Sequence, residues 1–410
     1  MRAGKPEHIS NLMNRKIWVT GTGVVSSVGM DYGECLYSLR NRSTGIGKIR
    51  ILETIHRSDF VAGEIGYTNR ELMKLLGILP EREKEYSRTS LLGMIAAREA
   101  ILDAGLNGDD GARTALVSAS TVGGMDRTEI EYPKKNIESG FVHTHPCGDS
   151  TDRIADFLGL RDYRTTLSTA CSSGANAIIH GARLIRHGRA DRVVAGGVDA
   201  LSKFTINGFN SLMILDREAC RPFDRDRKGL NLGEGAGYLV LESDELAVRR
   251  KGRRMCRLSG YANTNDAYHQ TASSPDGEGA FGAMSAALSM SGLEPSGISY
   301  INVHGTGTEN NDASEGAALI RLFGNDLPPF SSTKSFTGHC LGAAAGLEAV
   351  FSIMAIRENI LIPSLNFSHP IDGLGISPET ETREGVTVDH VLSNSFGFGG
   401  NNSALIFSKG

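Results

Sequence analysis

Short apolar runs rich in β-branched residues alternate along the chain with longer segments in which apolar residues recur every three or four positions. The short runs predict strands at 17–25, 115–119, 193–197, 237–241, 300–303 and 403–407. The longer segments predict helices at 90–104, 174–187, 279–291, 312–323 and 343–357. Regular alternation of strands and helices is typical of α/β proteins in which helices cover buried sheets. We therefore expect an α/β fold.

Two strand–turn–helix passages resemble each other. One joins the strand at 115–119 to Cys171 and its helix, and the other joins the strand at 300–303 to the helix that begins near residue 312. This internal similarity predicts two similar halves rather than two unrelated domains. Residues 1–15 are polar and show no pattern of apolar positions, so we expect an N-terminal tail there.

Composition and charge exclude several classes of protein. The chain has 410 residues and a formal net charge of −4, which offers nucleic acid or an anionic membrane no overall attraction. The longest uncharged run, 165–182, is rich in Ser, Thr and Gly, so we expect no membrane span. Six cysteines without regular spacing, and an N-terminus without a secretory signal, predict a reduced cytoplasmic protein that does not bind nucleic acid.

Cys171 stands among small residues, in the segment TACSSG at 169–174, and a helix is predicted to begin directly after it. A thiol at a helix N-terminus lies near unpaired backbone N–H groups and the positive end of the helix dipole, which favour the thiolate. Such sites lower a cysteine pKa from about 8.5 to roughly 3.5–7.5. Most cysteines are simply small buried hydrophobes. The cysteines that lack this setting are Cys35, Cys147, Cys220, Cys256 and Cys340.

Two histidines lie in turns of small residues. His304 follows a predicted strand, in NVHGTGT at 302–308, and α/β proteins bind ligands beyond the carboxyl ends of their strands. His339 ends the segment STKSFTGH at 332–339, just before an Ala/Gly-rich helix. Either histidine alone is as compatible with a structural role as with a catalytic one. Lys334 would usually be a solvated charge, but its place five residues before His339 makes it a candidate site residue.

The segment SNSFGFGGNN at 393–402 alternates Phe with Gly. It is compatible with a tight crossing in the core, or with a flexible turn that presents a backbone N–H and swings an aromatic side chain over a cavity. Two other patterns do not support a site. GTG at 21–23 lacks the rest of a dinucleotide fingerprint, and His143, His145 and Cys147 lack a clear fourth zinc ligand. We expect no cofactor and no catalytic metal.

These motifs, in this order, resemble the elongating β-ketoacyl-acyl carrier protein synthases, the KAS I/II group of the thiolase-like superfamily. The resemblance extends from VTGTG at 19–23 to LIF at 405–407 and includes RPFD at 221–224 and GEGAG at 233–237. It implies a five-layer αβαβα fold of two thiolase-like halves, 16–260 with the nucleophilic cysteine and 261–410 with the histidines. It also implies that the protein is a homodimer. The expected binding partner is an acyl carrier protein, in its acyl and malonyl forms.

The resemblance assigns roles to the candidate residues. Cys171 would attack an acyl thioester and hold the acyl group. His304 and His339 would stabilise the enolate that forms when malonyl-carrier loses carbon dioxide. The backbone N–H groups of Cys171 and Phe398 would form the oxyanion hole.

Supporting roles follow from the same resemblance. Lys334, paired with Glu348, would orient the two histidines. Phe398 matches the gating phenylalanine of the family, and Phe396 matches its neighbour. The residues that match a structural monovalent-cation site in some members are Asn302, Glu348, Ser393 and Asn394.

Two departures from the family pattern leave the acyl substrate open. Glu309 stands where members often have proline, and Asn401 stands where they often have threonine. The alternatives are therefore a ketosynthase of fatty acid synthesis and a ketosynthase subunit of a specialised polyene or polyketide pathway, paired with a chain-length-factor-like partner. The presence of Cys171 argues against a third alternative, a non-catalytic chain-length factor, because such proteins usually lack the nucleophilic cysteine. A thiolase normally has a second cysteine near the C-terminus, whereas the last cysteine here is Cys340.

Overall fold

A computed structural model describes residues 15–108 and 110–410, so the predicted tail lies outside the described residues except for its last position. The strands are β1 (Ile17–Ser26), β2 (Gly47–Lys48), β3 (Val61–Ala62), β4 (Thr114–Ala119), β5 (Tyr163–Leu167), β6 (Arg192–Asp199), β7 (Gly235–Ser243), β8 (Cys256–Asn265), β9 (Tyr300–Asn302), β10 (Phe330–Ser331), β11 (Ile360–Leu361), β12 (Arg383–Glu384), β13 (His390–Gly397) and β14 (Asn401–Lys409). The helices are α2 (Tyr32–Arg40), α3 (Asn69–Leu76), α4 (Arg88–Asp103), α5 (Met125–Glu131), α6 (Phe141–Thr144), α7 (Cys147–Leu158), α8 (Ser173–Arg186), α9 (Lys203–Ser211), α10 (Asp244–Arg249), α11 (Glu278–Ser291), α12 (Glu309–Phe323), α13 (Lys334–Thr337) and α14 (Ala344–Glu358).

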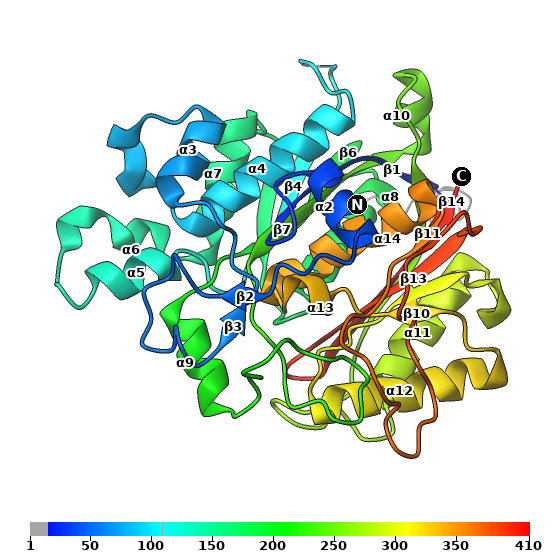
Figure 1. Cartoon of the computed structure of the whole chain (residues 1–410). Coiled ribbons are helices and arrows are strands. Elements are labelled where there is room, and N and C mark those ends of the chain that lie inside the picture. The colour runs from blue at the N-terminus through cyan, green and yellow to red at the C-terminus, as the bar shows by residue number, and fades with distance from the viewer. Residues whose placement is uncertain (1–14, 109) are drawn as a thin grey trace.

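One long sheet of the described chain runs in the order β10-β9-β13-β14-β8-β1-β7-β6-β4-β5 (Figure 1). It divides into two sets of five strands where β8 meets β1, which pair only over Trp18–Val19 and Cys256–Arg257. In each set the parallel strands lie farthest from this seam: β9 with β10 and β13, and β4 with β5 and β6. The matching strand order confirms two similar halves.

Helices form three layers around the two halves of the sheet. α4 and α7 pack on one outer face, and α11 and α12 lie at the opposite side (Figure 1). α8 and α14 contact each other in the middle, where each also packs on strands of both halves. The five-layer αβαβα arrangement expected from the resemblance is therefore present. The proposed division of the chain at residue 260 falls within β8 and stays a prediction.

Every strand and helix predicted from the hydrophobic pattern is present. The predicted match between the helix after Cys171 and the helix near residue 312, one from each half, is wrong. α8, which follows Cys171, lies in the central layer, whereas α12, near residue 312, packs on α11 in an outer layer. The helix that matches α8 by position is α14. Periodicity does not distinguish the two cases, because a central and an outer helix both alternate with strands along the chain.

The central helices approach the sheet so closely that some positions accept only glycine. A Cβ on Gly237 of β7 would stand 2.3 Å from the backbone carbonyl carbon of Gly346 in α14. A Cβ on Gly174 of α8 would stand 2.7 Å from the backbone nitrogen of Gly346. This packing brings the N-terminal ends of α8 and α14 together, and with them the segments that carry Cys171 and His339. None of the helices among the described residues is long and apolar enough to cross a membrane.

Candidate active site

Cys171 lies in a tight turn between β5 and α8. Ala170 adopts a left-handed conformation with φ of +53°, and the Ser173 N–H donates to the Ala170 carbonyl at 3.1 Å. α8 begins at Ser173, so Cys171 lies just outside its N-terminus, as the sequence predicted. A Cβ on Gly397 would stand 3.1 Å from the Cys171 nitrogen, and glycine there lets β13 approach this turn.

His304 lies in a turn after β9 that two acids of α12 hold in place. The four backbone N–H groups of residues 304–307 donate to the carboxylates of Glu315 and Asp312 at 2.8–3.2 Å. Burial raises the pKa of Glu315 to about 7, although the backbone donors act against this shift. Neither acid was among the site residues predicted from the sequence. Their signal is two carboxylates three residues apart near the start of a helix that directly follows a histidine turn.

His339 lies between α13 and α14, bonded to a neighbouring segment. Its backbone N–H donates to the Asn231 carbonyl at 2.7 Å, and its carbonyl accepts from the Gly233 N–H at 3.0 Å. Gly338 has a φ of +70°, and a Cβ there would stand 2.7 Å from the Leu232 carbonyl oxygen. The contact requires a glycine before the histidine, which explains the order of residues in this motif.

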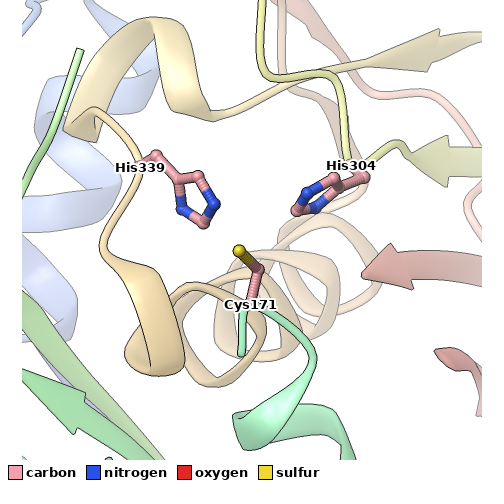
Figure 2. Close-up of side chains that lie close together, drawn as sticks. All are labelled: Cys171, His304 and His339. Atoms are coloured by element: carbon pink, nitrogen blue, oxygen red, sulfur yellow. The ribbon is translucent and has the colours of Figure 1, made fainter. Parts of the chain in front are cut away.

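The structure brings Cys171, His304 and His339 together from distant parts of the sequence, with the cysteine side chain directed toward the space between the two rings (Figure 2). The sulfur and one nitrogen from each ring lie within 4.8 Å of one another. The ring centroids are 5.4 Å apart and the rings are nearly perpendicular, at 86°. All three residues are buried.

Lys334 links His304 to a buried carboxylate. Its ammonium forms an ion pair with Glu348 of α14, the contact expected from the sequence. It also donates to the His304 carbonyl at 2.6 Å and lies 3.3 Å from His304 Nδ1. Both charged side chains are almost completely excluded from solvent. Removal of either partner would leave an uncompensated buried charge. Because Lys334 also binds the His304 carbonyl, the pair holds the histidine turn in place.

Hydrogen bonds define the protonation of both histidines. An ammonium cannot accept a hydrogen bond, so Nδ1 of His304 accepts from Lys334. Nδ1 of His339 accepts from the Leu341 N–H at 3.2 Å. Burial, assisted by the Lys334 charge, lowers the pKa of both histidines well below the usual value. Each ring is therefore neutral and carries its proton on Nε2, where it is a hydrogen-bond donor.

The same assignment bears on metal binding, since a thiol and two imidazoles this close also resemble a zinc site. A zinc ligand must offer an unprotonated nitrogen to the metal. In both His304 and His339 the Nδ1 lone pair accepts a hydrogen bond and Nε2 carries the proton. These contacts favour two N–H donors over two metal ligands.

The prediction of a lowered Cys171 pKa is wrong. Burial raises the pKa of the thiol to about 11, although the Lys334 charge and the backbone N–H groups of Phe398 and Cys171 act in the opposite direction. Desolvation of the thiolate thus outweighs the donors that face the sulfur. The resting residue is a thiol, and it lies where two backbone N–H groups favour negative charge.

The Phe/Gly segment is mostly strand, with a short turn in its middle. β13 ends at Gly397 and β14 begins at Asn401, so only 398–400 form the turn. The Phe398 ring stacks on Phe209 of α9, with centroids 5.9 Å apart. Phe396 is buried in β13 and its ring lies 5.8 Å from that of His304.

A cavity of about 360 Å³ gives access to the three residues. Cys171, His304 and His339 lie in its lining together with Phe396 and Phe398. Phe209 and segment 212–214 form another wall, and the rest of the lining comes from Gly397 and from residues 228–230, 271–273, 306 and 308–311. The cavity joins the thiol to the protein surface and is large enough for a narrow flexible ligand.

The residues expected near a monovalent cation lie on adjacent strands. Asn302 of β9 and Ser393 of β13 are paired in the ladder, and Asn394 follows. In the described part of the chain, both polar side-chain atoms of Asn302 and the Oδ1 of Asn394 are buried without a hydrogen-bond partner. Glu348 is close by, with Oε2 3.5 Å from the Ser395 hydroxyl. Unsatisfied buried oxygens beside a carboxylate fit a cation.

Comparison with known proteins places the chain in a family. Residues 14–247 match the domain family described as "Beta-ketoacyl synthase, N-terminal domain". Residues 255–368 match the family described as "Beta-ketoacyl synthase, C-terminal domain". A 3-oxoacyl-[acyl-carrier-protein] synthase 2 of Staphylococcus aureus (strain N315) is 33% identical over 97% of this chain and 99% of its own length. The chain therefore belongs to the β-ketoacyl synthase family.

Solved structures agree with this assignment. The ishigamide ketosynthase/chain length factor has a TM-score of 0.90 and 31% identity, over 97% of this chain and 99% of that one. A type II polyketide synthase ketosynthase, solved with its acyl-carrier protein as AntDE:AntF, has a TM-score of 0.84 and 25% identity, over 97% and 99% of the two chains. The recognised family and the thiolase-like ketosynthase fold are thus confirmed.

Proposed function

We propose that this protein is a 3-oxoacyl-[acyl-carrier-protein] synthase, an acyltransferase that condenses an acyl thioester with malonyl-acyl carrier protein in fatty acid synthesis. The observation that carries the proposal is the convergence of one buried thiol with two neutral imidazole N–H donors at the end of a cavity. The 33% identity to a synthase of this activity, over nearly the whole chain, supports it.

In the first half-reaction, the Cys171 sulfur attacks the carbonyl carbon of the acyl-carrier thioester. The oxyanion is stabilised by the backbone N–H groups of Cys171 and Phe398, which already favour negative charge at the sulfur. The bond from the acyl carbon to the carrier sulfur breaks, and the carrier leaves as a thiol with the proton that Cys171 lost. The products are acyl-Cys171 and free carrier.

In the second half-reaction, malonyl-carrier loses carbon dioxide and its thioester becomes an enolate. The Nε2–H groups of His304 and His339 donate to the enolate oxygen, which is why both rings must be neutral and hold Nδ1 in other contacts. The enolate carbon attacks the acyl-Cys171 carbonyl, the carbon–sulfur bond to Cys171 breaks, and the thiolate takes up one proton. The acyl chain leaves on the carrier, two carbons longer.

A second candidate function is a ketosynthase subunit of a polyene or polyketide pathway. The observation that favours it is the likeness to the ishigamide ketosynthase/chain length factor. In that case the partner would be a related subunit instead of a second copy. In either case β5 offers the means of association, because it is one of the two terminal strands of the described sheet, with β10 at the other end, and leaves one edge for pairing.

Further parts of the proposal concern the surroundings of the site. The protein acts in the cytoplasm with acyl carrier protein as its partner. Phe398, stacked on Phe209, gates the cavity, and Phe396 supports the His304 ring. Lys334 and Glu348 position the histidines. The residues that would hold a structural monovalent cation are Asn302, Glu348, Ser393 and Asn394.

The test is reconstitution with purified acyl and malonyl carriers. We expect wild-type protein to form a 3-oxoacyl-carrier, and intact-mass analysis to find the acyl group on Cys171 when malonyl-carrier is omitted. A panel of saturated and polyunsaturated acyl carriers separates the two pathways, because each enzyme should load its own chain class fastest. Condensation by a Cys171→Ala variant at the normal rate would contradict the assignment.

A further inference from the structure

Lys228 is an unpaired cation at the surface end of the cavity. It is exposed, and it is the only Lys or Arg that lines the cavity in the part of the chain that the structure describes. Its ammonium makes no hydrogen bond or ion pair with any described residue. Neighbouring arginines differ, since Arg221 pairs with Glu218 and Arg225 pairs with Asp226.

The backbone on both sides of Lys228 is fixed to the turn that carries His304. Gly229 N–H donates to the Gly307 carbonyl at 3.1 Å, and the Arg227 guanidinium donates to the Thr308 and Glu309 carbonyls at 3.2 and 2.8 Å. Gly229 itself has a φ of +149°, and a Cβ there would stand 2.4 Å from the Ile214 carbonyl oxygen. The backbone that carries this free ammonium is therefore held at a defined place relative to the His304 turn.

The other formal charge in the lining does not neutralise Lys228. Glu309 is exposed on the same rim, but the two side chains form no ion pair. The rest of the rim combines uncharged polar side chains, from Thr271, Ser273, Thr308, Asn310 and Asn311, with the exposed apolar side chains of Leu212 and Met213. A ligand that enters thus meets hydrogen-bonding groups along the wall and one cation at the rim.

We propose that Lys228 binds the phosphodiester of the 4′-phosphopantetheine arm by which the acyl donor enters the cavity. This inference rests on the proposed function, because an acyl group is delivered on such an arm with its thioester at one end and a phosphodiester at the other. A thioester at Cys171 leaves the anionic end of the arm toward the surface, where Lys228 stands. An ammonium is a suitable partner for one phosphate charge.

The test compares three donors with the same acyl group, carried on pantetheine, on 4′-phosphopantetheine and on the carrier protein. Lys228→Ala is expected to raise KM about three- to fivefold for the two phosphorylated donors, the effect of one exposed ion pair, with kcat unchanged. KM for the pantetheine thioester should not change. Lys228→Arg should restore the wild-type KM, and added salt should reduce the difference between wild type and Lys228→Ala.

Arg225→Ala is the matched control, because Arg225 is an exposed cation on the same loop that does not line the cavity. Its KM values should equal those of the wild type. An equal change for all three donors would overturn the inference in favour of a structural role, and a change with the carrier alone would overturn it in favour of contact with the carrier surface. If no donor acylates Cys171 in the wild type, the proposed function fails instead.

Discussion

Cys171 and Cys340 are both buried thiols close to His339, yet their surroundings differ in kind. The Cys171 sulfur faces the backbone N–H groups of Phe398 and Cys171 and lies at the cavity. The Cys340 sulfur lies 3.8 Å from the carbonyl oxygens of Thr337 and Gly338 and does not line the cavity. Burial raises the pKa of both. Two features distinguish the proposed nucleophile, Cys171: its sulfur is accessible from the cavity, and it faces hydrogen-bond donors. Hydrogen-bond donors stabilise a thiolate anion, whereas carbonyl oxygens stabilise the protonated thiol.

The largest expected effect is the loss of condensation activity in Cys171→Ala, compared with Cys340→Ala. Cys171→Ala is expected to reduce condensation by at least about 10⁴-fold, since no group remains to carry the acyl chain. Cys340→Ala should retain most of the wild-type rate. Intact-mass detection of the acyl-enzyme checks both variants, and circular dichroism checks that each is folded. Equal loss of activity in the two variants would remove the distinction between the cysteines.

The next largest effect is the loss of stability when the buried ammonium of Lys334 is removed. Lys334→Met should lower the free energy of unfolding by about 3–5 kcal/mol, because it leaves the Glu348 carboxylate buried without its partner. The double variant Lys334→Met/Glu348→Leu should recover much of this loss while remaining inactive. Urea denaturation provides the measurement. If the single variant is as stable as the wild type, the buried pair does not support the site.

The two histidines should affect one half-reaction more than the other. Replacing His304 or His339 with Ala is expected to slow malonyl decarboxylation by about 10²–10³-fold, the usual cost of one oxyanion donor. Acyl loading should fall less, because its oxyanion donors are backbone N–H groups that remain. Single-turnover loading of Cys171 and release of labelled carbon dioxide separate the steps. Equal losses would assign the histidines a different role.

The smallest effect is the pH dependence of thiol alkylation. With a raised folded-state pKa of about 11, Cys171 is a thiol at neutral pH, so its alkylation rate should rise about tenfold per pH unit up to about pH 10. Cys171 should also be labelled before Cys340, which does not line the cavity. Peptide mass spectrometry after brief iodoacetamide treatment measures both. A rate that is already constant above pH 7 would restore the stabilised thiolate that the sequence predicted.

The site could be predicted largely from residue types and their order. Cys171, His304, His339 and Lys334 stand in motifs whose small residues are needed for tight turns and close packing, so the pattern is visible in one sequence. The expected contact of Lys334 with Glu348 is present. The acids that hold the histidine turn, Asp312 and Glu315, were missed, because acids near the start of a helix are usually explained by the helix dipole.

The fold could be predicted at the level of elements but less well in their arrangement. Strong alternation of apolar runs located β1, β4 and β6 and the central helices. Of the long sheet it missed β5, β8, β10 and β13. The buried positions of β8 and β13 include Ser, Asn and Gly that pair within the sheet. Local periodicity also could not tell that α14, and not α12, matches α8, since that depends on which side of the sheet a helix crosses.

The sequence by itself determined the family of the chain, the identity of the reacting groups and the elements that carry them, because these depend on local residue patterns. Only the tertiary structure decided the ionisation of Cys171, the tautomers of His304 and His339, and the placement of Lys228 at the rim of the cavity. Each of these depends on desolvation and on contacts between segments distant in the chain. A helix start favours a thiolate locally, but burial costs the anion more than the local donors return.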